Sequence, residues 1–315
     1  MIKRELGRSG LMVGPLAFGG NVFGWTADQA MSHRLLDAFV DAGLNLVDTA
    51  DVYMKMHAGN RVGQSEEIIG AWLAQGGGRR DKIVLATKVG IEMAPGESGL
   101  SKAYILREVE QSLRRLRTDR IDLYQSHRDD PATPVAETLE AYAALIRQGK
   151  VRAIGASNFS VERLGEALRL SREAGLPRYE SYQPWYNLYD RDKFEGPEQE
   201  LCRRENVGVI SYFSLASGFL TGKYRKAGDL EGRARAYRVK DMMDARGMRI
   251  LAALDEVAAA ARATPAQVSL AWLVAHGVAA PIASATRPEQ LAELIGAANL
   301  TLSADAVARL DAASA

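Results

Sequence analysis

The chain has 315 residues, of which 47% are hydrophobic and 25% are charged, and its formal net charge is +1. These proportions are typical of a soluble globular protein, and the near-neutral charge gives no electrostatic signal for a nucleic acid or an anionic membrane as partner. One cysteine, Cys202, excludes an internal disulfide and favours a reducing cytoplasm as the location. The opening residues MIKRELGRSG lack the apolar core of a secretory signal, and no apolar run of about 18 residues indicates a membrane span.

The predicted elements alternate along the chain, beginning with a short hairpin over residues 2–16. Eight apolar, β-branched runs predict strands at 15–20, 44–50, 82–90, 120–127, 151–158, 179–187, 207–215 and 279–285. Helical patterns separate the strands at 28–43, 65–77, 103–116, 135–150 and 161–175, and several end at Gly, a common C-terminal stop. Two extra helices are expected at about 265–277 and 303–314. The segment 215–249 is too long for an ordinary connection, which is typical of a lid or a binding loop.

Eight strands that are each followed by a helix predict a parallel sheet covered by helices. The number of units favours one α/β domain over residues 1–315, a (β/α)8 TIM barrel whose bottom is capped by the N-terminal hairpin. A doubly wound sheet is the alternative. That fold would place a GxGxxG turn after the first strand, and the sequence AFGGNVFG at this place does not have that spacing.

Polar side chains recur where the predicted strands end. In a barrel, residues at the carboxyl ends of the strands point into a site on the top face. The spacing between these polar residues is about one strand–helix unit, so they keep phase with the strands, whereas a solvated surface would scatter them. The residues in question are Asp48, Tyr53, Lys88, His127, Ser157, Asn158, Gln183, Tyr212 and Ser214.

The motifs around these residues closely resemble those of the aldo-keto reductase family over nearly the whole chain. The matching stretches are NLVDTADVY, LATKVG, IDLYQSHRDDP, VRAIGASNFS, QPWYNLYDR, SYFSLASGFLTGKYR and PIASATRPEQL. The resemblance implies a (β/α)8 barrel that binds a nicotinamide cofactor without a Rossmann fold, which agrees with the missing GxGxxG. It also implies interconversion of an aldehyde or ketone and its alcohol.

By this resemblance, Tyr53 is the general acid that protonates the developing alkoxide. The phenol has an ordinary pKa of about 10, and we expect the ammonium of Lys88 to lower it. Asp48 would pair with Lys88, and His127 would hydrogen-bond the substrate carbonyl. Asp51 is left out of the catalytic set, because a local role in capping or turning the loop is expected of it.

The resemblance also assigns the cofactor residues. Ser157, Asn158 and Gln183 are expected at the carboxamide, and Tyr212 is expected to stack on the nicotinamide ring. A loop with a point charge for phosphate would cross the pyrophosphate, and the start of the last barrel helix would hold the adenosine end. Because an Arg at that helix start suits a 2′-phosphate, NADPH is favoured over NADH. These last two groups are Ser214, Leu215, Ser217, Gly218 and Lys223, then Thr286, Arg287, Gln290 and Glu293. Two positions depart from the family pattern: Ser284 replaces a usual Gly and Leu294 a frequent Asn.

The substrate pocket is expected to contain Trp25, Met54, Arg128 and Tyr186, which favours a hydrophobic aldehyde or ketone, bulky or aromatic. The basic run RARAYRVK at 233–240 is interpreted as a lid over the cofactor phosphate. The partner is thus a small-molecule carbonyl or alcohol, and the oligomeric state is left open as monomer or homo-oligomer.

Two other readings compete with the reductase. A metal-dependent hydrolase would need clustered ligands, and the four His show no HxH or HExxH spacing, so no metal is expected. Some proteins of this family type serve instead as auxiliary subunits of ion channels, so a cofactor-binding redox sensor with little turnover is the remaining alternative.

Overall fold

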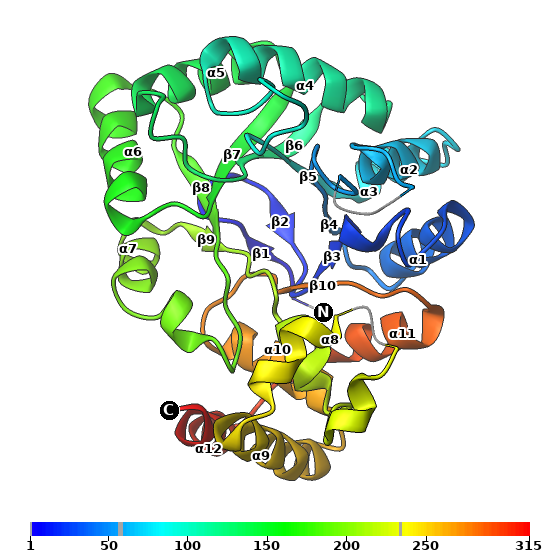
Figure 1. Cartoon of the computed structure of the whole chain (residues 1–315). Helices are drawn as coiled ribbons and strands as arrows, with labels where there is room; N and C mark the ends of the chain where they lie inside the picture. Colours follow the sequence, from blue (N-terminus) through cyan, green and yellow to red (C-terminus); the bar gives the residue numbers. More distant parts are fainter. Residues whose placement is uncertain (1, 56–58, 233–234) are drawn as a thin grey trace.

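The computed structural model describes residues 2–55, 59–232 and 235–315. It begins with an antiparallel hairpin of β1 (Arg4–Glu5) and β2 (Met12–Val13). Parallel strands then form one sheet in the order β10-β3-β4-β5-β6-β7-β8-β9 (Figure 1). Their bounds are β3 (Ala17–Gly19), β4 (Leu46–Asp48), β5 (Val84–Val89), β6 (Ile121–Ser126), β7 (Val151–Ser157), β8 (Tyr179–Gln183), β9 (Gly208–Val209) and β10 (Ile282–Ala283).

The sheet closes on itself at the seam between its last two strands in chain order. Next to β9 and β10, the amide of Ala279 donates to the carbonyl of Val209 over 2.8 Å, and the amide of Ile282 donates to that of Ser211 over 2.9 Å. On the other side, β10 pairs with β3 in parallel register. The predicted (β/α)8 barrel and its N-terminal hairpin are therefore confirmed, although most strands are shorter than the apolar runs that predicted them.

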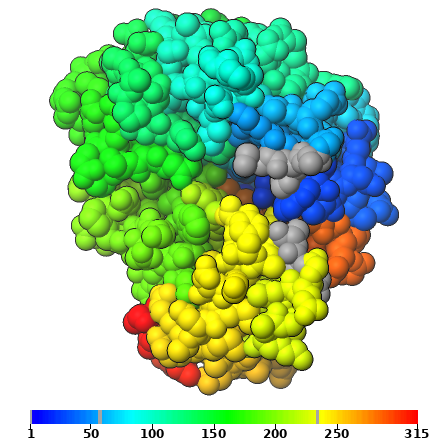
Figure 2. All heavy atoms as spheres, viewed as in Figure 1, coloured from blue at the N-terminus to red at the C-terminus, as the bar shows by residue number. Residues whose placement is uncertain are grey.

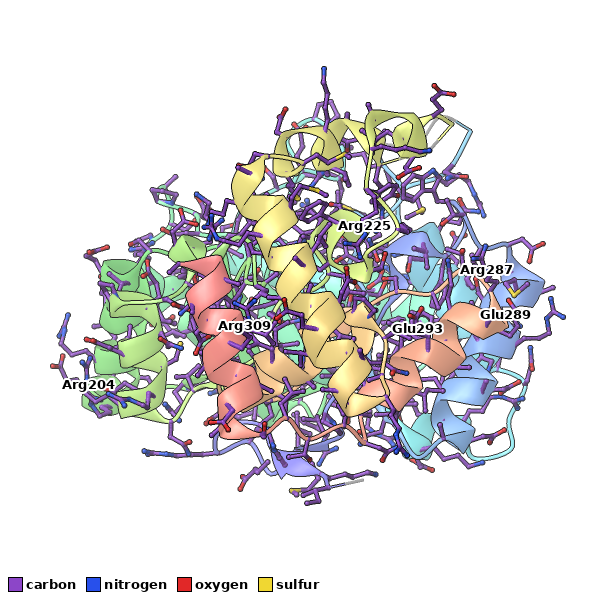
Figure 3. The ribbon with its side chains drawn as sticks, turned by 90° about the horizontal axis from the view of Figure 1, so that it is seen from below. Arg204, Arg225, Arg287, Glu289, Glu293 and Arg309 are labelled. Carbon is purple, nitrogen blue, oxygen red and sulfur yellow. The ribbon has the colours of Figure 1, made fainter. Side chains whose placement is uncertain are left out.

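Helices surround the strands on the outside (Figure 1). They are α1 (Gln29–Asp41), α2 (Gln64–Leu73), α3 (Arg79–Lys82), α4 (Lys102–Leu116), α5 (Val135–Arg147), α6 (Val161–Ala174), α7 (Pro197–Glu205), α10 (Pro265–Ala275) and α11 (Pro288–Ala297). Ser or Asp side chains cap α1, α4 and α6 by accepting from a backbone amide of the first turn, as the sequence signals require. The helix α9 (Ala245–Ala261) packs beside α12 (Ala304–Ser314), away from the strands (Figures 1 and 3).

The long segment after β9 has structure of its own. It contains the short 3₁₀ turns η3 (Ala216–Thr221), η4 (Ala227–Leu230) and η5 (Lys240–Met242) and the single-turn helix α8 (Ala236–Val239). The smaller 3₁₀ turns η1 (Gly20–Val22) and η2 (Arg191–Lys193) follow β3 and β8. Within the described residues, no helix is both long and apolar enough to cross a lipid bilayer.

The barrel interior changes character along its axis because alternate strand residues face inward. At the hairpin end, Leu6, Leu11 and Val13 pack with inward-facing Leu46 and Leu123 in one apolar cluster. Residues that face outward, such as Val47, Leu85 and Tyr124, belong to a separate cluster shared with the helices. Two positions further along the same inward faces, polar residues begin, and these form the site.

Candidate active site

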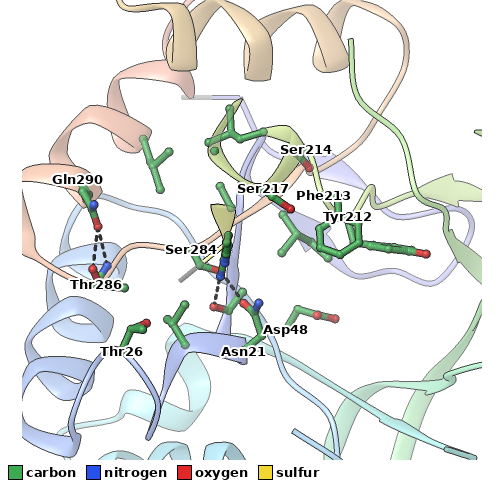
Figure 4. Close-up of a pocket in the computed structure, with 18 of the residues that line it drawn as sticks. Asn21, Thr26, Asp48, Tyr212, Phe213, Ser214, Ser217, Ser284, Thr286 and Gln290 are labelled. Carbon is green, nitrogen blue, oxygen red and sulfur yellow. Dashed lines mark hydrogen bonds between the residues drawn. The ribbon is translucent and has the colours of Figure 1, made fainter. Parts of the chain in front are cut away.

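A cleft of about 940 Å³ opens at the carboxyl ends of the strands. It is lined by Asp48, Tyr53 and His127 at one end and by residues of α11 at the other. Figure 4 shows part of this lining, and Figure 2 shows the face of the molecule, hollowed where its green, blue and yellow segments meet. All the residues expected to hold a cofactor line the cleft. Residues that follow different strands and lie far apart in sequence therefore meet in one cleft.

The centre of the site is a buried ion pair beneath Tyr53. Lys88 on β5 is fully buried and lies 2.5 Å from Asp48 Oδ2 on β4. Its ammonium also donates to the carbonyl of Thr49 over 2.8 Å and to the phenol oxygen of Tyr53 over 3.1 Å. All three protons of the ammonium are thus committed. Because Lys88 donates to the phenol oxygen, the phenol proton is left for another acceptor.

The electrostatics of Tyr53 differ from the sequence-based expectation. Burial raises the pKa of Tyr53 above its ordinary 10.0, and the lowering effect of Lys88 is not enough to reverse this. The charge of Asp48 works in the same direction as burial. For Lys88, burial acts to lower the pKa, but Asp48 and Tyr53 raise it overall. The expected net lowering was therefore wrong, and the site holds a protonated phenol beside a protonated amine.

Two amides hold the second oxygen of Asp48. Gln125 on β6 and Gln183 on β8 each donate to Asp48 Oδ1 over 3.0 Å. Gln183 also donates to Gln125 Oε1 over 3.1 Å. A buried carboxylate needs this complete set of partners, because each lone pair left unpaired costs free energy. Gln125 was not singled out from the sequence, although it lies two residues before His127 and so on the same face of its strand.

His127 lies beside the acid, with its ring centroid 6.0 Å from that of Tyr53 in an edge-to-face arrangement. Burial, with the charges of Lys88 and Arg128, holds its pKa well below 6.5. The imidazole is therefore neutral and keeps one N–H to donate. Its Nδ1 is buried and finds no hydrogen-bond partner among the described residues.

The ends of β7 and β8 are joined to the catalytic side of the cleft by side-chain hydrogen bonds. Asn158 has a left-handed backbone (φ 54°) and donates to the carbonyl of His127 over 2.9 Å. Its Oδ1 accepts the hydroxyl of Tyr212 over 2.8 Å, and Ser157 donates to the carbonyl of Gln183 over 2.8 Å. This network fixes the groups expected to orient a carboxamide.

The turn after β9 has an unusual backbone. Phe213, Ala216 and Ser217 all have positive φ although none is glycine, and Gly218 follows at φ 97°. Such clusters of uncommon dihedrals occur at ligand-binding loops. A Cβ added to Gly218 would lie 3.1 Å from Lys223 Nζ, so glycine keeps open the space where this ammonium faces the cleft.

The far end of the cleft lies at the start of α11. The amide and hydroxyl of Thr286 both donate to Gln290 Oε1, over 2.9 and 3.1 Å (Figure 4). Arg287 and Glu289 lie at this helix start and Glu293 about one turn further on (Figure 3). Ser284 lies 2.8 Å from the carbonyl oxygen of Gly19 and 2.7 Å from Asn21 Oδ1. The family's usual glycine is thus replaced here by a side chain that joins β10 to the segment after β3.

Only one of the four expected pocket residues lines the cleft. Trp25 does so. Tyr186 is buried between Phe194 and Trp272, and Met54 is buried with a left-handed backbone. Arg128 is exposed and outside the lining.

Met54, Arg128 and Tyr186 lie outside the lining for the same reason. The position of a residue beside a motif does not fix the direction of its side chain. Sequence reasoning also missed Asn21, Thr26, Phe213 and Arg235, which do line the cleft. The first two follow the first strand in GGNVFGWT, so their polarity just beyond a strand end was the available signal.

Asp51 does not have the turn-capping role expected of it. It is fully buried, and neither carboxylate oxygen has a hydrogen-bond partner among the described residues. Burial raises its pKa well above 3.8, and the neighbouring charges of Glu66 and Glu108 add to this. The protonated form of this carboxyl is therefore favoured in the folded protein. Within the described residues, no group of His, Cys, Asp and Glu side chains is arranged to hold a metal ion.

A barrel whose top face carries a Tyr, a Lys–Asp pair and a neutral His beside a long cleft defines a class, the carbonyl and alcohol oxidoreductases. Comparison with known proteins agrees with this class. The model of the aldo/keto reductase family matches residues 15–315, so the chain belongs to that family.

Individual relatives extend the comparison. The chain is 36% identical over 304 residues to "Uncharacterized oxidoreductase YrpG" of Bacillus subtilis (strain 168), covering 94% of this chain and 91% of the relative. It is 32% identical to "L-glyceraldehyde 3-phosphate reductase" of Escherichia coli (strain K12), covering 98% and 91%. It is 33% identical to "Probable voltage-gated potassium channel subunit beta" of Oryza sativa subsp. japonica, covering 92% and 89%.

Proposed function

We propose that the protein is an NADPH-dependent oxidoreductase that interconverts an aldehyde or ketone and its alcohol, with Tyr53 as the proton donor. One observation carries the proposal: the phenol oxygen of Tyr53 accepts from a lysine that Asp48 holds in place, in a cleft of about 940 Å³ whose lining also includes residues of α11. When bound, the nicotinamide would supply the hydride.

The residues along the cleft fit such a cofactor. Hydrogen-bonding groups near Asn158 suit a carboxamide, and the open turn at Gly218 with Lys223 suits a pyrophosphate. Thr286 and Arg287 offer a hydroxyl and a guanidinium at the start of α11, and the guanidinium of Arg287 is exposed and lies 3.9 Å from Glu289. An arginine available at this place supports NADPH over NADH, because it can pair with a 2′-phosphate.

The protein's own groups account for the proton. Lys88 fixes the phenol oxygen of Tyr53 and directs the hydroxyl proton away from itself, toward the cleft. The raised pKa keeps that proton on the phenol at neutral pH, ready to be given to an alkoxide. The neutral imidazole of His127 can donate its N–H to the same oxygen and stabilise the charge that develops there.

The test is the loss of reduced-nicotinamide absorbance with NADPH and a panel of aldehydes, for wild type and Tyr53→Phe. The panel includes aromatic aldehydes and, because a relative is named for it, glyceraldehyde 3-phosphate. We expect turnover to fall by about 10²–10⁴-fold in the variant, the usual contribution of positioned proton transfer. NADPH affinity, followed by fluorescence, should not change. Full turnover by Tyr53→Phe would remove the acid from the proposal.

A second candidate function, a cofactor-binding regulatory protein, is supported by the similarity to the relative named as a channel subunit. A protein of that kind would bind NADPH and a partner but turn over slowly. The aldehyde panel separates the two, because tight NADPH binding without turnover of any aldehyde would favour the regulatory role. A stable complex in a pull-down with NADPH present would then support it directly.

A further inference from the structure

Gln125 on β6 is a fully buried amide that lies beneath the active site and does not itself line the cleft. It stands in register with Lys88 on β5 and with Gly155 on β7. A Cβ added to Gly155 would lie 3.1 Å from Gln125 Cγ, so the glycine leaves space for this side chain. The barrel thus encloses an amide that can act on a ligand only through its neighbours.

The orientation of the Gln125 amide follows from Asp48. An ionised carboxylate can only accept hydrogen bonds, and Asp48 is paired with Lys88 through its other oxygen. The group of Gln125 that lies 3.0 Å from Asp48 Oδ1 is therefore its amide nitrogen. Because the nitrogen faces Asp48, the side-chain oxygen of Gln125 faces Gln183 and accepts from it over 3.1 Å.

Two acceptors then fix the amide of Gln183 on β8. Asp48 Oδ1 and Gln125 Oε1 lie 3.0 and 3.1 Å from its nitrogen, and together they accept both of its protons. If this amide were turned over, its oxygen would face two other oxygens and both hydrogen bonds would be lost in a buried place. Gln183 lines the cleft, so its side-chain oxygen is the atom left to bind a ligand there.

Asp48 alone would not restrict Gln183 in this way. It would hold one of the two protons and leave the other free to turn toward an acceptor on a ligand. With Gln125 in place, both protons are occupied, and Gln183 offers the cleft an acceptor only.

We propose that Gln125 is a positioning residue that fixes Gln183 as a hydrogen-bond acceptor toward the cofactor, so that the site selects a nicotinamide ring whose substituent carries N–H donors. The inference rests on the proposed reductase function and deepens it. A carboxamide supplies the required N–H groups, whereas a ketone in the same place supplies an acceptor only and would leave the oxygen of Gln183 unpaired.

The experiment compares the binding of NADP+ with that of its 3-acetylpyridine analogue, in which a methyl ketone replaces the carboxamide. Calorimetry measures both affinities without any turnover. Wild type should bind NADP+ more tightly than the analogue. Gln125→Met keeps an unbranched side chain but removes both hydrogen-bonding atoms, and it should reduce that preference by about 2–10-fold, the scale of one neutral hydrogen bond.

Ser181→Ala is the matched control. Ser181 on β8 is fully buried beside Gly155, and its hydroxyl has no hydrogen-bond partner in the part of the chain that the structure describes. The substitution removes a polar atom near Gln125 without touching either glutamine amide, so the preference for NADP+ should stay that of wild type.

A second variant, Gln125→Glu, keeps an oxygen facing Gln183 and should retain the preference. Loss of the preference in this variant would show that the acceptor at position 125 does not set it, and would overturn the proposal even if Gln125→Met does not fold.

Other outcomes separate this proposal from the reductase function. Equal loss of affinity for both ligands in Gln125→Met would assign Gln125 a general structural role and overturn the inference, as would a wild type that binds both ligands equally. The expected preferences without turnover of any aldehyde would support the inference and count against the reductase only. A wild type that binds neither ligand would overturn both.

Discussion

The floor and the mouth of the barrel are made by the same strands and the same inward faces, yet they have opposite character. On β4 the inward residues are Leu46 and then Asp48, and on β6 they are Leu123 and then Gln125. The floor residues pack with apolar side chains of the hairpin and its neighbours. Those at the mouth form a connected set of hydrogen bonds around one ion pair.

The difference shows that the two ends of the barrel are stabilised in different ways. Apolar residues at the floor gain free energy from burial alone, about 1.5–3 kcal/mol for a large side chain. Lys88 and Asp48 are just as buried but depend on each other, because the desolvation of each charge is offset by its partner and by the hydrogen bonds around the pair. Stability at the floor is therefore local, whereas stability at the mouth depends on a complete set of partners.

The largest effect is expected from Lys88→Met, which removes the positive charge of the ion pair at the mouth and keeps a side chain of similar length. Asp48 is left buried without its counter-ion, so the free energy of unfolding should fall by about 3–5 kcal/mol. Reductase turnover should also be lost, because the phenol of Tyr53 loses its positioning partner. Chemical denaturation and the NADPH assay measure the two effects.

Asp48→Asn combined with Lys88→Met is the matched control. Removing both charges should recover much of the lost stability without recovering turnover. If the single variant is as stable as wild type, the ion pair is not the element that holds the mouth together.

A substitution at the floor should lower stability without affecting the site at the mouth. Leu123→Ala removes a fully buried side chain that packs in the hairpin cluster. It should cost about 2–5 kcal/mol of stability by leaving a cavity, while kcat of the folded protein and NADPH affinity remain those of wild type. Denaturation midpoints and initial rates, measured well below the unfolding transition, test this. A large fall in kcat would mean that floor and mouth are not independent.

The smallest effect concerns Asp51, because burial raises the pKa of its carboxyl in the folded state. Below its ordinary pKa of 3.8 the carboxyl is protonated both folded and unfolded, so it carries no pH-dependent cost there. As pH rises above that value, the carboxyl ionises in the unfolded chain before it does so in the folded chain, and stability falls. Asp51→Asn cannot ionise, so it should be more stable than wild type by about 1 kcal/mol or more near pH 7 and equal near pH 3.

Thermal unfolding of both proteins over that pH range is the measurement. A gap that shrinks as pH rises would show that Asp51 is ionised in the folded protein.

Much of the fold could be predicted from the sequence because strand and helix patterns differ in period. The runs around Leu46, Leu85 and Leu123 are apolar on both faces, as strands in a covered parallel sheet must be. Polar residues that follow such runs in phase predicted the convergence of Asp48, Lys88 and His127. Their roles in catalysis stay predictions, as do the cofactor contacts and the extent of the domain.

The sequence could not predict the direction in which individual side chains point. Nor could it predict which of two opposing effects on a pKa is the larger. Tyr186 has the composition of a pocket residue but faces Trp272. The pKa of Tyr53 depends on whether burial or Lys88 has the larger effect, and no motif expresses that difference. Part of the segment 233–240 lies outside the described residues. Its expected role as a lid over the cofactor phosphate stays a prediction. The stacking of Arg235 on Trp25 joins segments that no local pattern connects.

The pairing of the first barrel strand with the last has a consequence for how the protein folds. Ser284 and Gly19 meet across 265 positions of the chain, and Asp48 and Gln183 across 135. Contacts this distant in sequence form late, because a long loop must close before they are gained. During synthesis, the first strand must therefore wait for nearly the entire chain before it finds its last neighbour. We expect a ribosome-bound chain that ends before β10 to have no cofactor cleft, so NADPH binding would report completion of the barrel.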